Sequence, residues 1–121
     1  MPKKVLIIED SFDIGESLRQ LIEFEGYEAM LATGGVDGFD KARAEAPDLI
    51  LMDVDLPDVN GIELTRDLRA NPQTAKIPIL CVSSYTRGIE DEVLNAGCNE
   101  VFSKTSFMIS FAPTLSRYLK D

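Results

Sequence analysis

The sequence predicts an α/β protein built on a doubly wound parallel sheet of five strands, with helices on both faces. Apolar runs without polar alternation, such as residues 49–52, are typical of strands that are buried on both faces. These runs alternate along the chain with segments whose apolar residues recur at helical spacing. Strict alternation of strand and helix favours right-handed crossovers, and therefore a parallel sheet.

Length and composition indicate one folded unit. At 121 residues the chain can bury one core but not a second, so we expect residues 1–121 to form a single domain. The apolar fraction of 45% is that of a folded protein and not of a disordered chain. No apolar run approaches the ~18 residues of a membrane span, and no signal peptide precedes the first strand. We therefore expect a cytoplasmic protein that does not contact membranes.

Charge and residue usage argue against two further classes of site. The formal net charge of -9 disfavours a nucleic-acid surface, which needs clustered Lys and Arg. With no His and only two Cys, a zinc site is very improbable. Cys81 lies in an apolar run and Cys98 follows a glycine, a pattern that favours two free core thiols over a disulfide.

The first half of the chain predicts three strands and two helices. We expect strands over residues 4–8, 27–32 and 49–52. One helix should run over residues 12–25, after the cap residue Ser11 and before Gly26, and a second should end before Pro47. The apolar residues that recur at helical spacing on these two helices are Ile14, Leu18, Leu21, Ile22, Val36, Phe39 and Ala42.

The second half predicts two more strands and three helices. A helix should begin near Gly61 and end at Asn71-Pro72. Strands are expected over residues 77–82 and 100–103, with a helix between them that stops at Gly97. The apolar residues predicted to face the core from the last two helices include Ile89, Val93, Leu94, Ala96, Phe107, Met108, Phe111, Leu115 and Leu119. Because Pro113 lies inside the last pattern, that helix should begin near it or bend there.

Polar residues follow four of the predicted strands. Glu9 and Asp10 follow the first strand, Asp53 the third, Ser83 the fourth and Lys104 the fifth. The carboxyl ends of parallel strands meet at one edge of the sheet, where α/β proteins place their chemistry. Flavodoxin-like sheets of this size have strand order 2-1-3-4-5, in which the first and third strands are neighbours. We therefore expect the three acids to lie together.

Three neighbouring carboxylates require a cation. Two unit charges ~4 Å apart cost about 4 kcal/mol at an effective dielectric near 20, so a cation must be close or the pKa of one acid must rise. Lys104 could supply one positive charge, and Mg²⁺, which prefers hard oxygen ligands, could supply two more. A carboxylate at such a metal can attack phosphorus and form an acyl phosphate. Ser83 could then donate a hydrogen bond to one phosphoryl oxygen, and Lys104 could pair with another.

Over essentially its whole length the chain resembles the receiver domain of bacterial two-component response regulators. The matching positions come in the family's order on the family's elements: the metal-binding acids Glu9 and Asp10, the phosphoacceptor motif Asp53, Leu56, Pro57 and Gly61, the switch hydroxyl Ser83, and Lys104. Several motif positions in the right order make a far more specific signal than any one of them alone.

The resemblance implies a phosphorylation-operated switch, not an enzyme in the usual sense. A sensor histidine kinase or histidine phosphotransfer protein would donate a phosphoryl group to Asp53, with Mg²⁺ as cofactor and slow autodephosphorylation. The backbone carbonyl of Asp55 would complete a metal shell formed with Glu9, Asp10 and Asp53. The phosphorelay signal would leave through a downstream protein bound at the fourth helix, fifth strand and fifth helix. Whether the active form is a homodimer, and whether the chain stands alone or belongs to a longer protein, stay open.

Two positions depart from the family pattern. Val101 stands where an aromatic residue is usual, so the aromatic rotamer switch coupled to the hydroxyl is missing. Thr105 stands where a proline usually follows a cis bond, and a cis bond to another residue costs ~3 to 4 kcal/mol. We expect a trans peptide there, or a strained one that positions Lys104. Tyr85 should pack on the fourth helix rather than gate the site.

Other functions remain as alternatives. Val101 and Thr105 favour a receiver-like module that binds partners constitutively, whereas the intact acid pair, Ser83 and Lys104 oppose it. Residues 53–55 resemble the first motif of haloacid-dehalogenase-type phosphatases, but that family carries the motif on its first strand. A calcium loop is excluded because Pro57 stands where Asp or Asn is required. Taken singly, the acid pair also fits a solvated strand end, and Lys104 a surface lysine.

Overall fold

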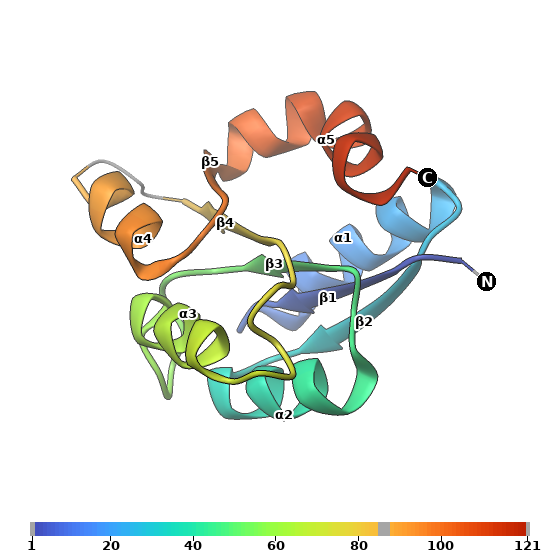
Figure 1. The fold of residues 1–121 in the computed structure, drawn as a ribbon. Coiled ribbons are helices and arrows are strands. Elements are labelled where there is room, and N and C mark those ends of the chain that lie inside the picture. Colours follow the sequence, from blue (N-terminus) through green and yellow to red (C-terminus); the bar gives the residue numbers. More distant parts are fainter. Residues whose placement is uncertain (1, 85–87, 121) are drawn as a thin grey trace.

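A computed structural model of the chain describes residues 2–84 and 88–120, and in it five parallel strands form one sheet (Figure 1). The strands are β1 (Lys4–Ile8), β2 (Glu28–Ala32), β3 (Leu49–Met52), β4 (Ile79–Ser83) and β5 (Glu100–Ser103). The helices are α1 (Phe12–Phe24), α2 (Gly35–Glu45), α3 (Gly61–Ala70), α4 (Glu90–Ala96) and α5 (Lys104–Leu119). The strand order is β2-β1-β3-β4-β5, which confirms the predicted fold and order.

The apolar runs of the central strands lack polar alternation because helices cover both faces of the sheet (Figure 1). Alternate residues of β1, β3 and β4 point to opposite faces. Those packed on the side of α2, α3 and α4 are Leu6, Ile8, Ile50, Met52, Ile79 and Cys81. Those packed on the side of α1 and α5 are Val5, Ile7, Leu49, Leu51, Leu80 and Val82. The core is therefore two apolar layers separated by the sheet.

Some apolar helix residues that the sequence pattern places in the core are not buried. Four side chains that were expected in the core are exposed instead, namely Ile14, Val36, Leu94 and Met108. Ile14, Val36 and Met108 lie in the opening turns of α1, α2 and α5, which start at the carboxyl edge of the sheet, beyond the last paired strand residues. Gly15 and Gly38 of α1 and α2 lie against the strand side chains Leu31 and Ile8, whereas Ile14 and Met108 border a gap between α1 and α5.

Helix α5 bends close to the position that Pro113 predicts. Ser110, three residues before the proline, has non-helical dihedral angles of φ -109° and ψ 16°. Proline lacks the N–H that would bond to the preceding turn, and its ring crowds that turn, so the bend precedes it. The helix nevertheless begins at Lys104, well before Pro113, with Ser103 as its N-cap.

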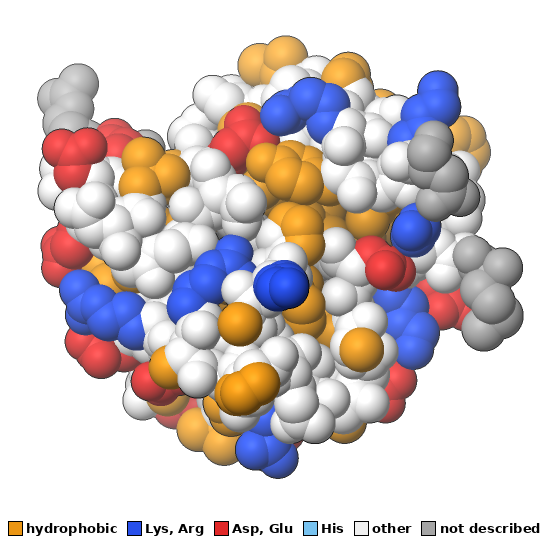
Figure 2. Space-filling model, in the orientation of Figure 1, with side chains coloured by type: hydrophobic (Ala, Val, Ile, Leu, Met, Phe, Trp, Pro, Cys, Tyr) orange, Lys and Arg blue, Asp and Glu red, His pale blue; other side chains and the backbone are white. Residues whose placement is uncertain are grey.

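The surface mixes charged and apolar side chains. On the face drawn in Figure 2, acidic and basic side chains are interspersed, and apolar side chains gather in a hollow next to α5. Of the helices within residues 2–84 and 88–120, none has the length and hydropathy needed to cross a bilayer. Cys81 and Cys98 are buried free thiols, as predicted.

Candidate functional site

The pairing of β1 with β3 brings Glu9 and Asp53 side by side at the carboxyl edge. Ile8 and Met52 are partners in the sheet, and the next residue of each strand is the acid. The Asp53 amide donates to the Ile8 carbonyl at 2.9 Å, which extends the ladder by one bond beyond β3. Both acids are buried, with 3% of Glu9 and 8% of Asp53 exposed. Two carboxylates are thus held at the sheet edge with little access to water.

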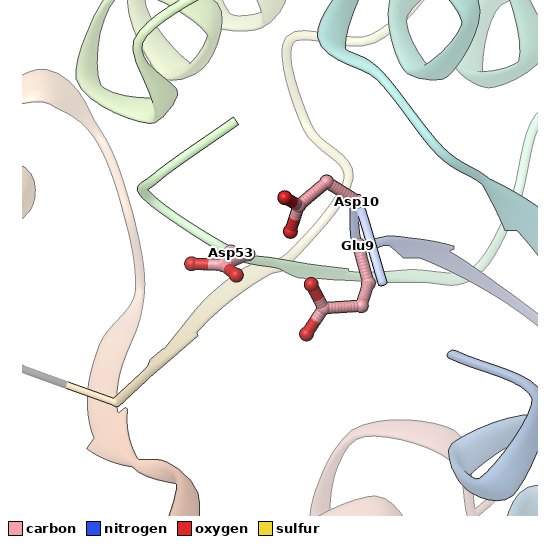
Figure 3. A group of neighbouring side chains, drawn as sticks. All are labelled: Glu9, Asp10 and Asp53. Carbon is pink, nitrogen blue, oxygen red and sulfur yellow. The ribbon is translucent and has the colours of Figure 1, made fainter. Parts of the chain in front are cut away.

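Asp10 completes a group of three acids. One carboxylate oxygen from each of Glu9, Asp10 and Asp53 lies within 4.8 Å of the others, and the three side chains converge in Figure 3. Asp10 itself is exposed. The neighbouring Glu9 carboxylate, together with partial desolvation, raises the pKa of the Asp10 carboxyl. The group offers hard oxygen donors of the kind that divalent cations such as Mg²⁺ prefer.

Lys104 faces the two buried acids. Its Nζ lies 2.9 Å from Glu9 Oε1 and 3.7 Å from Asp53 Oδ2. Burial lowers the pKa of Lys104, but the hydrogen bond to Glu9 and the surrounding acidic charges outweigh it, so the pKa is raised overall. The lysine therefore stays cationic at neutral pH. Glu9 Oε2 also accepts a hydrogen bond from the Ser11 amide at 3.2 Å, so both oxygens of Glu9 have donors.

The loop from Asp53 to Asn60 is folded tightly against its own strand. Asp53 Oδ1 accepts a hydrogen bond from the Asp55 amide at 3.0 Å, and the Val54 carbonyl accepts one from the Gly61 amide at 2.9 Å. A Cβ at Gly61 would lie 2.7 Å from the Val54 Cα and 3.0 Å from the Asp53 carbonyl oxygen. Only glycine fits this approach, which returns the chain to α3 directly beside the acid.

Ser83 lies at the same edge, at the end of β4, and is fully buried. It is the sheet partner of Ser103, the residue before Lys104. Val101 packs with the α2, α3 and α4 layer, whereas the neighbouring Phe102 packs with the opposite layer, 5.7 Å from the Phe107 ring between centroids. Phe102 therefore does not replace the aromatic residue that is missing at position 101. Tyr85 lies outside the described residues.

The peptide between Lys104 and Thr105 is trans, one of the two outcomes expected from the missing proline; no cis bond occurs in the part of the chain that the structure describes. Ser103 caps α5 by accepting a hydrogen bond from the Ser106 amide at 3.0 Å. Because the helix starts at once, Lys104 sits in its first turn and extends back toward Glu9.

Two features of this edge were not predicted from the sequence. The first is Asp58, whose carboxylate bonds to the N-terminus of α2; the only sequence signal was a helix start at Gly34-Gly35 without a capping side chain. The second is a cavity of about 360 Å³ between α1 and α5. Apolar side chains line most of it, and Glu9, Asp53 and Lys104 lie at one end. No local pattern encodes a gap between two helices.

Known proteins share both sequence and fold with this chain. A family model described as response regulator receiver domain matches residues 5–109. The polar-differentiation response regulator DivK of Brucella anthropi is 38% identical over 122 residues, covering 100% of this chain and 99% of its own. DivK of Brucella ovis is 37% identical over the same shares of the two chains.

Solved structures give the same result for the fold. The chemotaxis protein CheY4 of Vibrio cholerae superposes with a TM-score of 0.90 at 28% identity, covering 98% of this chain and 100% of its own. The receiver domain of the sensor histidine kinase PA1611 of Pseudomonas aeruginosa, solved with a magnesium ion coordinated in the active site cleft, superposes with a TM-score of 0.89. It is 24% identical and covers 100% of both chains, so it supports the fold alone.

Proposed function

This chain belongs to the response regulator receiver domain family, and from that membership we propose that it is a signalling switch operated by phosphorylation of Asp53. The observation that carries the proposal is the buried Asp53 carboxylate, flanked by the Lys104 ammonium and by two further acids. Glu9 and Asp10 would bind the metal, Lys104 would pair with the phosphoryl group, and Ser83 would donate a hydrogen bond to it.

The transfer is a displacement at phosphorus. An Asp53 oxygen forms a new P–O bond while the P–N bond of a phosphohistidine on the donor breaks, and the bonding electron pair returns to the imidazole. The donor would be a sensor histidine kinase or a histidine phosphotransfer protein. Asp53 Oδ1 and Oδ2 face the Asp55 amide and Lys104, so the nucleophile is oriented before the donor arrives. Water attack on the acyl phosphate, slow because the site is buried, would reset the switch.

The donor set fits Mg²⁺. Three carboxylate oxygens within 4.8 Å of one another are hard ligands with excess negative charge, and the Asp55 backbone carbonyl is proposed as a fourth protein ligand. When bound, the ion would neutralise the acids and the charge on the transferring phosphoryl oxygens. The PA1611 receiver domain, which has the same fold, holds a magnesium ion in its active site cleft; for this chain the choice of metal rests on its own donor set.

The output is proposed to pass through protein contacts at α4, β5 and α5. Phosphorylation adds charge and acceptor oxygens beside Lys104, which begins α5, and beside Ser83, the sheet partner of Ser103 at the end of β5. With Val101 in place of an aromatic residue, the shift would be carried by Ser83 and by the start of α5.

The buried free thiols Cys81 and Cys98 fit a reducing compartment, so we propose that the protein is cytoplasmic.

The test is the intact mass after incubation with acetyl phosphate, with and without Mg²⁺. We expect one added phosphoryl group on the wild type that requires Mg²⁺ and is absent from Asp53→Asn. Asp48→Asn, which changes an exposed acid at the opposite end of β3, should be phosphorylated like the wild type. If no adduct forms within the trapping time although Mg²⁺ binds, the chain is instead a constitutive interaction module. Turnover of a small phosphomonoester would identify a phosphatase.

A further inference from the structure

The loop that carries Asp53 and Asp55 is fastened at two places. Its inner half is held by its own backbone, since the Val54 carbonyl accepts hydrogen bonds from the Leu56 amide at 3.1 Å and from the Gly61 amide at 2.9 Å. Its outer half is held by Asp58, whose Oδ1 accepts from the Gly35 amide at 2.7 Å and whose Oδ2 accepts from the Val36 amide at 3.0 Å. Asp58 thus joins the phosphoacceptor loop to α2.

Helix α2 has no cap from its own segment. Gly34 occupies the N-cap position and has no side chain to accept a hydrogen bond from the first turn. The carboxylate of Asp58, 23 residues after Gly35, accepts these hydrogen bonds instead and also faces the positive end of the helix dipole. The bonds from the Gly35 and Val36 amides lower the pKa of Asp58, so its carboxylate is ionised at neutral pH.

Gly34 and Gly35 have no side chains, and this leaves room for the contact with the loop. A Cβ at Gly34 would lie 3.2 Å from Asp58 Oδ2, and one at Gly35 would lie 2.9 Å from the Val59 Cβ. The start of α2 is therefore pressed against residues 58–59 of the loop. Gly34, Gly35 and Asp58 are none of the motif positions described above.

The same loop forms one wall of the acid site. Residues 54–60 line an open hollow of about 320 Å³ together with Asp10. Asp55 lies inside the inner turn, between Val54 and Leu56, and this turn leads directly into the stretch that Asp58 holds. Releasing the outer attachment would let the turn tilt as a unit and so move the Asp55 carbonyl relative to Asp10, while the bond from the Asp53 amide to the Ile8 carbonyl would still hold Asp53 at the end of β3.

Resting on the function proposed above, we propose that Asp58 is a positioning residue for phosphorylation: by bonding to the N-terminus of α2 it sets the place of the Asp55 carbonyl, and hence the affinity of the site for Mg²⁺. Its carboxylate is engaged by the Gly35 and Val36 amides, so it is proposed to act through the loop and not as a metal ligand. The structure of the loop thus depends on a helix that contributes no ligand to the site.

The experiment compares Mg²⁺ binding, measured by calorimetry on the unphosphorylated protein, in Asp58→Ala, Asp58→Asn and Asp48→Ala. Asp48 is the matched control, because it is also an exposed acid that accepts a backbone hydrogen bond across the chain, from the Lys4 amide at 2.8 Å, but at the far end of the sheet. Losing a residue that orients metal ligands costs on the order of tenfold in affinity. We expect that loss in Asp58→Ala, a smaller one in Asp58→Asn, whose amide oxygen can still accept one bond, and none in Asp48→Ala.

A second readout is the Mg²⁺ concentration that half-saturates phosphorylation by acetyl phosphate. This concentration should rise in Asp58→Ala in step with the dissociation constant for Mg²⁺, while the rate of phosphorylation at saturating Mg²⁺ changes little.

Equal Mg²⁺ affinity in Asp58→Ala and Asp48→Ala would overturn the inference, even if Asp58→Ala unfolds at a lower temperature, because Asp58 would then be a helix cap only. Equal losses in Asp58→Asn and Asp58→Ala would also overturn it, since charge alone would explain them. A wild type that binds Mg²⁺ but is never phosphorylated would instead refute the proposed function.

Discussion

At the scale of single residues, the site is a set of like charges held together by one lysine. Glu9 and Asp53 are buried, and their nearest cation in the described residues is Lys104. Buried carboxylates are tolerated only when they are paired, so the fold depends on Lys104 until a metal arrives. A residue expected to act on the phosphoryl group therefore also has a structural role in the resting protein.

Replacing Lys104 separates these roles. In Lys104→Met, we expect the free energy of unfolding without metal to fall by about 2 kcal/mol, because Glu9 loses a charged hydrogen-bond partner. Mg²⁺ affinity should rise, since the ion no longer competes with the ammonium, whereas phosphorylation by acetyl phosphate should slow. Urea unfolding measures the stability, calorimetry the Mg²⁺ affinity and intact mass the phosphorylation.

Lys41→Met, which removes a surface ion pair to Asp37, is the control and should be phosphorylated normally. Weaker Mg²⁺ binding in Lys104→Met would contradict this account.

At the scale of elements, the turn from β3 into α3 is set by a close backbone approach. Gly61→Ala would place a Cβ 2.7 Å from the Val54 Cα, where no side chain can move aside. We expect a loss of about 2 kcal/mol in unfolding free energy and slower phosphorylation of Asp53, because the loop must shift. Gly15→Ala is the matched control: its Cβ would lie 2.4 Å from Leu31 Cδ1, but this contact is with a side chain that can change rotamer and not with backbone. Its stability should stay within about 1 kcal/mol of the wild type. Similar losses in both variants would rule out the backbone explanation.

The edge strand β5 is tied to the end of α5 by Tyr118, whose hydroxyl donates a hydrogen bond to Glu100. Burial and this bond raise the pKa of Tyr118 to about 12, above the value of 10.0 expected for the unfolded chain. Between these two pKa values, the Tyr118 hydroxyl of the unfolded chain loses its proton while that of the folded protein keeps it. The stabilisation by the bond to Glu100 is therefore complete below pH 10 and declines as pH rises toward 12.

Tyr118→Phe tests this tie. It should lower the free energy of unfolding by about 1 kcal/mol at pH 7, through the lost hydrogen bond to Glu100. The difference from the wild type should narrow as the pH rises above 10, and urea titrations at several pH values measure it. A difference that stays constant up to pH 11 or so would show that folding does not raise the pKa of Tyr118, and would contradict the hydrogen bond to Glu100 as the cause.

At the scale of the whole molecule, the net charge of -9 opposes the compact state through self-repulsion. Both NaCl and Mg²⁺ should therefore stabilise the protein, but Mg²⁺ should do more than NaCl at equal ionic strength, because it also binds the acid site. A ligand at a hundred times its dissociation constant adds about 2.7 kcal/mol. Asp10→Asn should lose the part specific to Mg²⁺ and keep the response to NaCl. Equal stabilisation by both salts in the wild type would mean that Mg²⁺ acts only by screening.

Much of this protein was predictable because its signals are local. Unbroken apolar runs identified β1, β3 and β4, and helical spacing identified the helices and the bend near Pro113. Because parallel strands end at one edge, residues that follow those strands could be expected to meet there, as Glu9, Asp53 and Lys104 do. The roles of these residues in phosphorylation, and that of Ser83, stay predictions.

Only the tertiary structure decided the rest. A sequence pattern says which face of a helix is apolar, but not how closely neighbouring elements pack over it, so Ile14 and Val36 were placed in the core and are exposed. The contact of Asp58 with the first turn of α2 and the distances from Lys104 to the acids join segments far apart in the chain. Such contacts depend on how whole elements pack against one another, and that packing is a property of the assembled fold, which no short stretch of sequence records.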